Sequence, residues 1–308
     1  MSRLPALDNL DLNYGAIQRI SALRLSDSIS FGVLGDCKNS PVFDYVVKAI
    51  NQDKSLNFCI INGDLVFYPT MDTYRDFLSR WRRIKVPTLV IPGNHEIEAQ
   101  GRSIYYTVFG GFYYSLEVGN SFLIMLDDSN GRSLGREQTL WLRRQLEKSL
   151  KFRHRFIFLH VPLRDPRYNR TSYSHSLRNH NLVNVLENLF LKYKVTAVFA
   201  SHIHAYYEYS MDGVRYIITG GGGARLSVDD PAHGFFHYVR VSVRGDRVRI
   251  EPVKVEIKDF WARISDYFVF AKLYVLTLLK VYAGQLTTIL LLSLLNLSVL
   301  MRRGKEGK

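Results

Sequence analysis

Seven polar side chains along this chain are of types that bind divalent metals or transfer protons, and they come at the ends of short apolar runs. They are Asp36, Asp64, Asn94, His95, His160, His202 and His204. Carboxylate and amide oxygens and imidazole nitrogens are the ligands of hard and borderline divalent cations. Taken singly, a Gly-Asp after a strand indicates a turn, and a strand-end histidine indicates a structural role. In succession, these residues predict a metal site assembled from separate segments.

The apolar runs before these residues alternate with stretches of helical period, which is typical of an α/β fold. Ser40 and Pro41 indicate the start of the first helix, as an N-cap residue followed by proline. The predicted strands lie at 29–34, 58–61, 88–91, 122–126, 156–159 and 195–200, and later helices at about 70–83, 138–150 and 182–193. Farther on, Asp212-Gly213 and Arg244-Gly245-Asp246 predict hairpins,. Because ligands bind at the carboxyl ends of strands in open α/β sheets, the site is expected there.

The order of these motifs resembles that of the calcineurin-like metallophosphoesterase superfamily, over about residues 31–255. The specific parts of the pattern are Gly93-Asn94-His95-Glu96 and His202-Ile203-His204, with His160 between them. The resemblance implies a four-layer sandwich of two mixed β-sheets flanked by helices. It also implies one or two divalent metal ions per chain (Mn, Fe, Zn or similar).

The resemblance also assigns the ligands. Asp64 would bridge two metals, Asp36 and His204 would hold the first, and Asn94, His160 and His202 would join Asp64 on the second. Two cations about 3.5–4 Å apart lower the pKa of a shared water and orient it for in-line attack on phosphorus. His95 resembles the general acid of the family, with a hydrogen-bonding role beside the ligands as the alternative.

Other residues near the motifs are candidates for contacts around the reaction. Arg164, Arg167 and His175 follow His160 in a long polar loop that could reach a substrate phosphate,. Asp127 is a candidate carboxylate partner of a ligand histidine, with a strand-end turn as the alternative,.

The sequence departs from the family pattern at the first metal. The usual Asp-x-His is Asp36-Cys37-Lys38 here, and a protonated lysine cannot coordinate a metal,. Purple acid phosphatases also lack that histidine but supply a tyrosine where this chain has Phe67. Three alternatives stay open: the first site binds metal weakly, it borrows Asn39 or water, or it stays empty while Lys38 lends positive charge to the phosphate. A catalytic and a merely structural Lys38 are both consistent with the sequence. Ser201 replaces a glycine of the pattern, which is a milder change,.

Length and charge narrow the class of protein. The chain has 308 residues, 47% of them hydrophobic, which predicts a large folded domain rather than disorder,. Its net charge of +13 favours anionic partners, which are a phosphorylated substrate, a phospholipid surface or nucleic acid,. Cys37 and Cys59 do not form a disulfide framework or a zinc ribbon by spacing,. The first 30 residues contain no signal-peptide core.

The C-terminal segment changes character, because residues 281–301 contain no charged side chain and are rich in leucine. This length is enough to cross a bilayer as a helix, and basic residues flank it on both sides. We therefore divide the chain into an N-terminal extension (1–28), a metallophosphoesterase domain (29–257), a juxtamembrane helix (258–280), a transmembrane helix (281–301) and a basic tail (302–308). A core or oligomerisation helix is the alternative. We expect a single-pass C-terminal anchor with the catalytic domain in the cytoplasm.

These observations predict metal-dependent hydrolysis of a phosphomonoester, phosphodiester or diphosphate bond by a metal-activated water, at a membrane surface. A catalytically impaired binding or scaffold module is the alternative, because the first metal site is altered. A nuclease is a third hypothesis, and it predicts strongly salt-dependent binding of nucleic acid.

Overall fold

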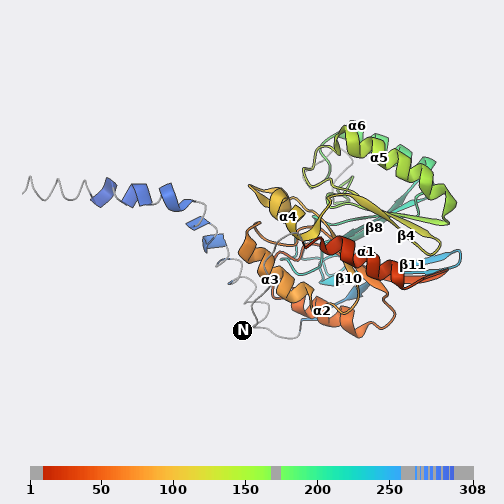
Figure 1. Ribbon diagram of the computed structural model, residues 1–308, viewed down its shortest axis with the longest axis horizontal. Coiled ribbons are helices and arrows are strands. Elements are labelled where there is room, and N and C mark those ends of the chain that lie inside the picture. The colour runs from red at the N-terminus through yellow and green to blue at the C-terminus, as the bar shows by residue number, and fades with distance from the viewer. Residues whose placement is uncertain are drawn as a thin grey trace, which may run out of the picture.

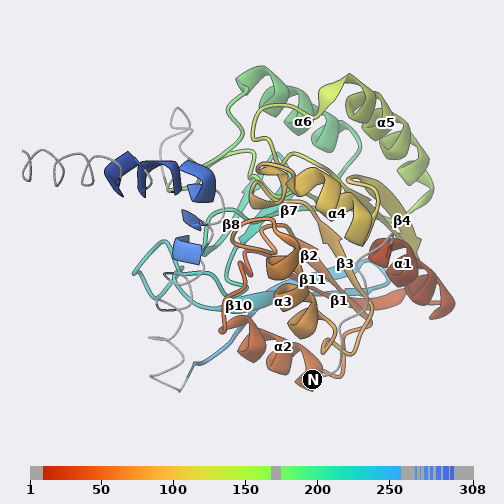
Figure 2. The same ribbon diagram turned by 60° about the vertical axis from the view of Figure 1, so that its left-hand side comes forward.

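The structure is a computed structural model that describes residues 10–167 and 175–257, together with scattered positions between 268 and 294. Two β-sheets face each other, and helices cover their outer faces (Figures 1 and 2). The predicted sandwich of two mixed sheets flanked by helices is therefore confirmed.

The first sheet has the strand order β11-β10-β1-β2-β3. Its members are β1 (Ser28–Leu34), β2 (Phe58–Asn62), β3 (Thr88–Ile91), β10 (His237–Arg244) and β11 (Arg247–Lys254). Strands β1, β2 and β3 are parallel, whereas β10 pairs antiparallel with both β1 and β11. The β10–β11 hairpin turns at Gly245, as the sequence predicts.

The second sheet has the strand order β4-β5-β6-β7-β9-β8. Its members are β4 (Tyr114–Val118), β5 (Ser121–Met125), β6 (His154–Phe158), β7 (Ala197–Ala200), β8 (Tyr206–Met211) and β9 (Val214–Thr219). Strands β5, β6, β7 and β9 are parallel, and β4 and β8 are antiparallel edge strands. The predicted hairpin at Asp212-Gly213 joins β8 to β9.

Three apolar cores hold these layers together. The core between the sheets is built from phenylalanines, with Phe31 stacked on Phe58 at 5.1 Å and Phe158 stacked on Phe199 at 5.2 Å. A second core lies between the first sheet and helices α2 (Phe43–Gln52), α3 (Met71–Trp81) and α4 (Gly101–Phe109). A third lies between the second sheet and helices α5 (Gly135–Lys148) and α6 (His180–Lys192). The central strands are therefore buried on both faces, between the other sheet and the helices,.

The first predicted helix begins later than expected. Its N-cap is Val42, because Ser40 and Pro41 lie in a turn before it, where Ser40 Oγ accepts a hydrogen bond from the Val42 amide at 3.1 Å. In contrast, α3 begins as predicted at Thr70, which forms a capping box with Thr73,.

Part of the predicted N-terminal extension packs against the domain. Helix α1 (Leu12–Ala22) contacts β3, α4 and β4 and buries Ala16 and Ile20. The Asn13 side chain both donates to the Val90 carbonyl and accepts from the Val90 amide, at 3.0 and 2.9 Å. This helix therefore completes the hydrogen bonding of β3 at the open edge of the first sheet.

The described positions from 268 to 294 are helical, and in Figure 1 they run away from the two sheets. Among the residues that the structure describes, no helix has both the length and the apolar character needed to cross a bilayer. The segments predicted at 258–280 and 281–301 lie partly outside the described residues, and 302–308 lies wholly outside them.

Candidate metal centre

The seven candidate residues lie in the loops that follow five strands of the two sheets. Asp36 follows β1, Asp64 follows β2, Asn94 and His95 follow β3, His160 follows β6, and His202 and His204 follow β7. Since these strands are parallel within each sheet, their carboxyl ends meet on one side of the sandwich. Residues that are 168 positions apart at the extremes, from Asp36 to His204, therefore reach one place.

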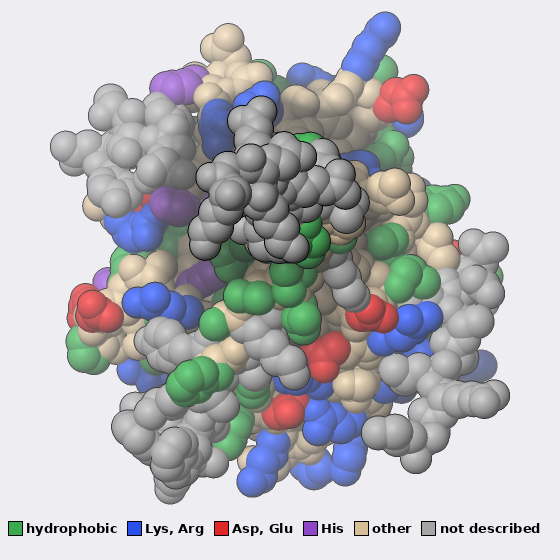
Figure 3. Space-filling model, turned by 90° about the vertical axis from the view of Figure 1, so that its left-hand side faces the viewer, with side chains coloured by type: hydrophobic (Ala, Val, Ile, Leu, Met, Phe, Trp, Pro, Cys, Tyr) green, Lys and Arg blue, Asp and Glu red, His purple; other side chains and the backbone are tan. Residues whose placement is uncertain are grey.

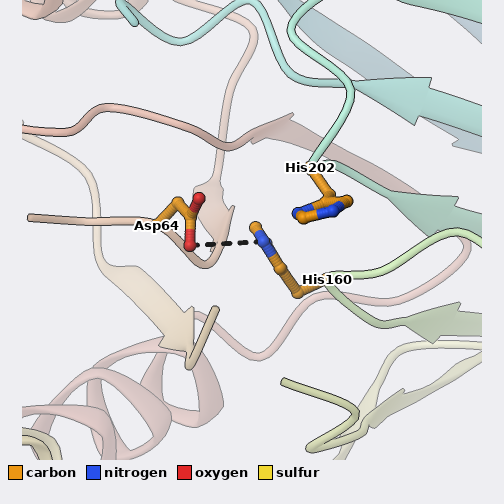
Figure 4. A group of neighbouring side chains, drawn as sticks. All are labelled: Asp64, His160 and His202. Carbon is orange, nitrogen blue, oxygen red and sulfur yellow. Dashed lines mark ion pairs between the residues drawn. The ribbon is translucent and has the colours of Figure 1, made fainter. Parts of the chain in front are cut away.

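The predicted second metal site comprises Asp64, Asn94, His160 and His202. The ligand atoms of Asp64, His160 and His202 lie within 4.8 Å of one another (Figure 4). His160 Nε2 is 3.3 Å from Asp64 Oδ1 and 3.1 Å from Asn94 Oδ1. His160 Nδ1 donates to the Asn62 carbonyl at 2.7 Å, so Nε2 is the nitrogen presented to a cation,.

The charge states of this site suit a cation. Burial, together with the neighbouring His160, lowers the pKa of His202 to about 3, so His202 is a neutral ligand,. Burial would also lower the pKa of His160, but the Asp64 and Asp36 carboxylates outweigh it and the pKa is raised. A divalent cation among these donors would take the place of that proton.

The predicted first metal site comprises Asp36, Asp64 and His204, whose potential ligand atoms also lie within 4.8 Å of one another. His204 Nε2 is 3.2 Å from Asp36 Oδ1, and His204 Nδ1 donates to the Arg225 carbonyl at 2.6 Å. Lys38 extends into the same place, with Nζ 3.0 Å from Asp64 Oδ2. Burial lowers the pKa of Lys38, but Asp64 and Asp36 outweigh it and raise the pKa, so the side chain is an ammonium.

Two buried carboxylate oxygens without hydrogen-bond donors bear on whether metal ions fit between these side chains. Asp36 Oδ1 and Asp64 Oδ2 are fully buried and have no hydrogen-bond donor aligned with them among the described residues, although Lys38 pairs with Asp64 Oδ2 through charge. Buried carboxylate oxygens without donors are costly unless a cation satisfies them. Both of these oxygens lie at the predicted first site, where the Lys38 ammonium stands against Asp64 Oδ2 and His204 Nε2 lies 3.2 Å from Asp36 Oδ1. The predicted second site fits a divalent metal by its donor set, which is one carboxylate, one amide oxygen and two imidazoles,.

The backbone is strained at three of the candidate ligands. Asp36, Asp64 and His202 have φ values of 61°, 54° and 66°, in the left-handed region that is unfavourable for residues other than glycine,. Such conformations persist where the surroundings enforce them, and they cluster at functional sites. Here the Asp36 carboxylate accepts from the His202 amide at 2.8 Å, which links two of the three strained residues.

Glu96 organises the loops of the site, a role that the sequence does not reveal. Its carboxylate is fully buried and accepts from the amides of Asp64, Leu65, Val66 and Gly93 at 2.7–3.1 Å. Burial, reinforced by the Asp64 charge, raises the pKa of Glu96 to about 7. This one side chain therefore links the loop after β2 to the loop after β3 by hydrogen bonds.

The carboxylate behind His160 is Asp128, and the interpretation of Asp127 as that partner is wrong. Asp128 accepts from the amides of His160 and Val161 at 2.8 and 3.0 Å. Asp127 instead pairs with Arg102 at 2.7 Å, on the other side of the strand end. Asp128 therefore positions the backbone of the ligand rather than its imidazole.

Asn39 is not available to the first metal site. Its Nδ2 donates to the Thr73 carbonyl and to Asp76, and its Oδ1 accepts from the Phe67 amide at 3.0 Å. One end of the amide therefore ties the loop after β1 to α3, and the other end ties it to the loop after β2. This removes the alternative in which Asn39 replaces the missing histidine.

His95 lies beside the two sites rather than within either group of ligands. Its Nδ1 donates to the Phe67 carbonyl at 2.5 Å, and its Nε2 is 3.8 Å from Asp64 Oδ2. About a fifth of its side chain is exposed. The ring therefore presents Nε2 toward the site from a solvent-accessible position.

The three residues predicted to contact substrate separate in the structure. His175 lies near the ligands, with its ring 5.7 Å from that of His202. Arg167 makes a two-bond ion pair with Asp165. Arg164 makes another with Glu187 of α6, at 2.6 and 2.7 Å, and lines a cavity of about 320 Å³ with Tyr216 and Met211. Arg164 therefore faces α6, and His175 is the best placed of the three.

Ser201 stands where the family pattern has a glycine. Its side chain leaves no room for a Cβ at Gly35 in the neighbouring loop, so that position requires glycine. A Cβ on Gly35 would lie 2.0 Å from Ser201 Oγ, which donates to the Thr219 carbonyl. The loops after β1 and β7 thus touch directly, and they hold Asp36 against His202.

The comparisons with known proteins agree with this geometry. The family model for calcineurin-like phosphoesterases matches residues 29–206, which is more than half of the chain. The chain therefore belongs to the calcineurin-like phosphoesterase family. This family uses divalent metals, and the two groups of donors described above could hold them.

Individual relatives point to purple acid phosphatases. Purple acid phosphatase 23 of Arabidopsis thaliana is 33% identical over 192 residues, which cover 52% of this chain and 41% of that protein. The chain thus matches less than half the length of this curated relative. A purple acid phosphatase from yellow lupin (Lupinus luteus) seeds has a TM-score of 0.59 at 19% identity, covering 76% of this chain and 53% of that one. GAP50, the anchor in the inner membrane complex of Plasmodium, has a TM-score of 0.61 at 12% identity, covering 76% and 87%. These structural likenesses show the fold.

Proposed function

We propose that this chain hydrolyses a phosphoester bond in a metal-dependent reaction. The observation that carries the proposal is the convergence of Asp64, Asn94, His160 and His202, which offer two oxygen and two imidazole donors at one point. A metal bound there supplies an activated water and neutralises charge that develops on the phosphate. The family and the purple acid phosphatase relatives support the same reaction class.

The protein side chains supply the remaining steps. Asp128 and Glu96 hold the ligand loops, so the donors are in place before substrate arrives,. His95 presents Nε2 toward Asp64 and can transfer a proton to the leaving oxygen,. The hydrogen bond from Nδ1 to the Phe67 carbonyl sets the direction of that ring.

The test is metal content together with Mn²⁺-dependent hydrolysis of nitrophenyl phosphate and bis-nitrophenyl phosphate. We expect turnover that depends on metal and that is lost in His202→Ala. An exposed histidine offers a matched control: His180→Ala, at the first residue of α6, should keep full activity. Folded protein that binds metal but does not hydrolyse either ester would contradict the proposal.

A binding module without catalysis is the second candidate, and one observation favours it. The Lys38 ammonium lies against Asp64, the shared ligand, where the family pattern has a metal-binding histidine instead. The fold also occurs in GAP50, an anchor protein. The hydrolysis assay separates the two candidates, because a binding module predicts ligand affinity without metal-dependent turnover.

We also propose that the chain acts at a membrane surface. Large apolar side chains are exposed at the described positions between Phe268 and Leu294, including Tyr274, Ile289 and Leu290. Figure 3 shows hydrophobic side chains near the middle of the face from which this segment projects, with lysine and arginine around them. The Tyr274 ring also lies 6.2 Å from that of Phe67, next to His95. An exposed apolar segment beside the site would place lipid-linked phosphates within reach.

Flotation with phosphatidylcholine–phosphatidylserine vesicles tests this proposal. We expect the full chain to float, and Ile289→Glu with Leu290→Glu to sink. Leu150→Glu removes an equally exposed leucine outside this segment and should float like the unchanged protein. Equal flotation of all three proteins would show that the apolar segment does not bind the vesicles.

A further inference from the structure

The two oxygens of Asp64 face different positive groups. Oδ1 lies 3.3 Å from His160 Nε2 and accepts from the His95 amide at 3.1 Å. Oδ2 lies 3.0 Å from Lys38 Nζ, in a pair where the lysine side chain is 12% exposed and the aspartate is fully buried. One oxygen is thus directed at the His160 imidazole and the other at the Lys38 ammonium.

The position of Lys38 is fixed by its loop. The Lys38 amide donates to the Asp64 carbonyl at 3.0 Å, and the Asn39 amide donates to the Leu65 carbonyl at 3.3 Å. Lys38 and Asn39 both have left-handed backbones, with φ of 43° and 57°. Because the loop after β1 is bonded to the loop after β2 on both sides of Lys38, its side chain is directed along Asp64.

The first metal site is therefore incomplete in two respects. Among the described residues it offers the Asp36, Asp64 and His204 groups, and Asn39 is engaged with α3 and Phe67. In addition, the Asp64 oxygen that faces this site, Oδ2, is already paired with the Lys38 ammonium. A divalent cation bound to that oxygen would repel the ammonium, and lysine at neutral pH cannot become a ligand in its place.

We propose that this chain binds a single divalent metal, at Asp64, Asn94, His160 and His202, and that the Lys38 ammonium takes the place of the second cation. Lys38 then contacts a non-bridging oxygen of the phosphate on the Asp36 side, as a point charge with three donors. The role of Lys38 toward phosphate rests on the proposed hydrolysis, but the count of metals does not.

The test is metal stoichiometry by elemental analysis after equilibration with Mn²⁺ and gel filtration. We expect one ion per chain in the unchanged protein and two in Lys38→His, which restores the Asp-x-His pattern. Lys48→His places the same residue at an exposed position of α2 and should retain one ion. Two ions in the unchanged protein, or one ion in Lys38→His that is folded by circular dichroism, would overturn the proposal.

Lys38→Met supplies a second measurement if Lys38→His does not fold. Calorimetry with inorganic phosphate on the Mn²⁺-loaded protein should show at least tenfold weaker binding in Lys38→Met, with one metal still bound. Lys48→Met should bind phosphate as the unchanged protein does. Unchanged phosphate affinity in Lys38→Met would remove Lys38 from the anion site. A protein with one metal and no turnover would overturn the proposed hydrolysis while leaving the metal count intact.

Discussion

The two halves of the metal centre share Asp64 but differ in how their other groups are held. In the second metal site, His160 is oriented by the Asn62 carbonyl through its ring and by Asp128 through its backbone amide. In the first, Asp36 and His204 lie within 3.2 Å of each other, and Lys38 stands where the family pattern supplies a histidine. The comparison teaches that one half of a phosphoesterase site can change without dismantling the other, because the hydrogen bonds that orient His160 do not involve Lys38 or His204.

Removal of Asp64 is expected to have the largest effect, since both halves depend on it. Asp64→Ala should lower kcat/KM by more than about 100-fold, because loss of a group that merely supports a ligand already costs about 10–100-fold. Asp36→Ala should cost less if the second metal site carries the reaction. Steady-state kinetics with saturating Mn²⁺ on both variants tests this order, and equal losses would mean that the halves are not separable.

Removal of the Glu96 carboxylate should destabilise the loops after β2 and β3, which carry Asp64 and Asn94. Glu96→Ala leaves four buried amides without an acceptor, which we expect to lower the free energy of unfolding by about 4 kcal/mol,. Urea denaturation of the metal-free protein measures this. Glu137→Ala, an exposed glutamate in the first turn of α5, is the matched control and should change stability by less than about 0.5 kcal/mol,.

Low pH should lower the free energy of unfolding through protonation of His237, a fully buried residue of β10. Its ring donates to the Phe235 carbonyl at 2.8 Å. It packs so closely against Gly221 that an added Cβ there would lie 2.2 Å from the ring, and a Cβ on the adjacent Gly220 would lie 2.7 Å from Asp36 Oδ2. Burial lowers the pKa of His237 from 6.5 to about 4. The unfolded chain therefore binds the proton first, and stability present above pH 6.5 falls as the pH drops toward 4, by about 3 kcal/mol.

Urea midpoints at pH 7 and pH 4.5 measure this loss. His237→Gln cannot titrate in this range and should show a smaller decrease between the two pH values. A decrease of the same size in both proteins would assign the acid sensitivity to other groups.

The smallest effect is expected at Arg164, which lies outside both halves. Arg164→Ala should change kcat/KM less than twofold, because its guanidinium is held by Glu187 on α6. His175→Ala should have the larger effect of the two, since His175 lies beside His202. Kinetics with nitrophenyl phosphate compare them, and a large loss in Arg164→Ala would extend the site toward α6.

The strands and the convergence of the candidate ligands could be predicted because both depend on local pattern. A buried run followed by Gly-Asp or Gly-Asn-His is visible along the chain, and parallel strands bring such ends together. The sequence does not show that Asp128 binds the His160 amide whereas Asp127 binds Arg102. Adjacent residues at a strand end point to opposite sides, and the sequence does not say which side faces His160. The same holds for Lys38, whose contact with Asp64 depends on how two loops bond to each other.

Long-range polar contacts were also beyond prediction. Asn13 completes the bonding of Val90 from 77 residues away, and no periodicity marks α1 as part of the domain. Arg164 and Glu187 are 23 residues apart and meet only because α6 packs beside the loop after β6. A polar loop near a ligand therefore predicts proximity to the site but not the direction of its side chains.

The left-handed backbone at Asp36, Asp64 and His202 has a consequence for engineering. Glycine at each position would relieve roughly 1–2 kcal/mol of backbone strain. Replacing a buried carboxylate would also remove a charge that needs a cation. Selection for thermal stability alone would thus favour substitutions that remove these ligands, and the most thermostable variants would lack hydrolytic activity. Any directed evolution of this protein needs turnover as a second criterion in every round.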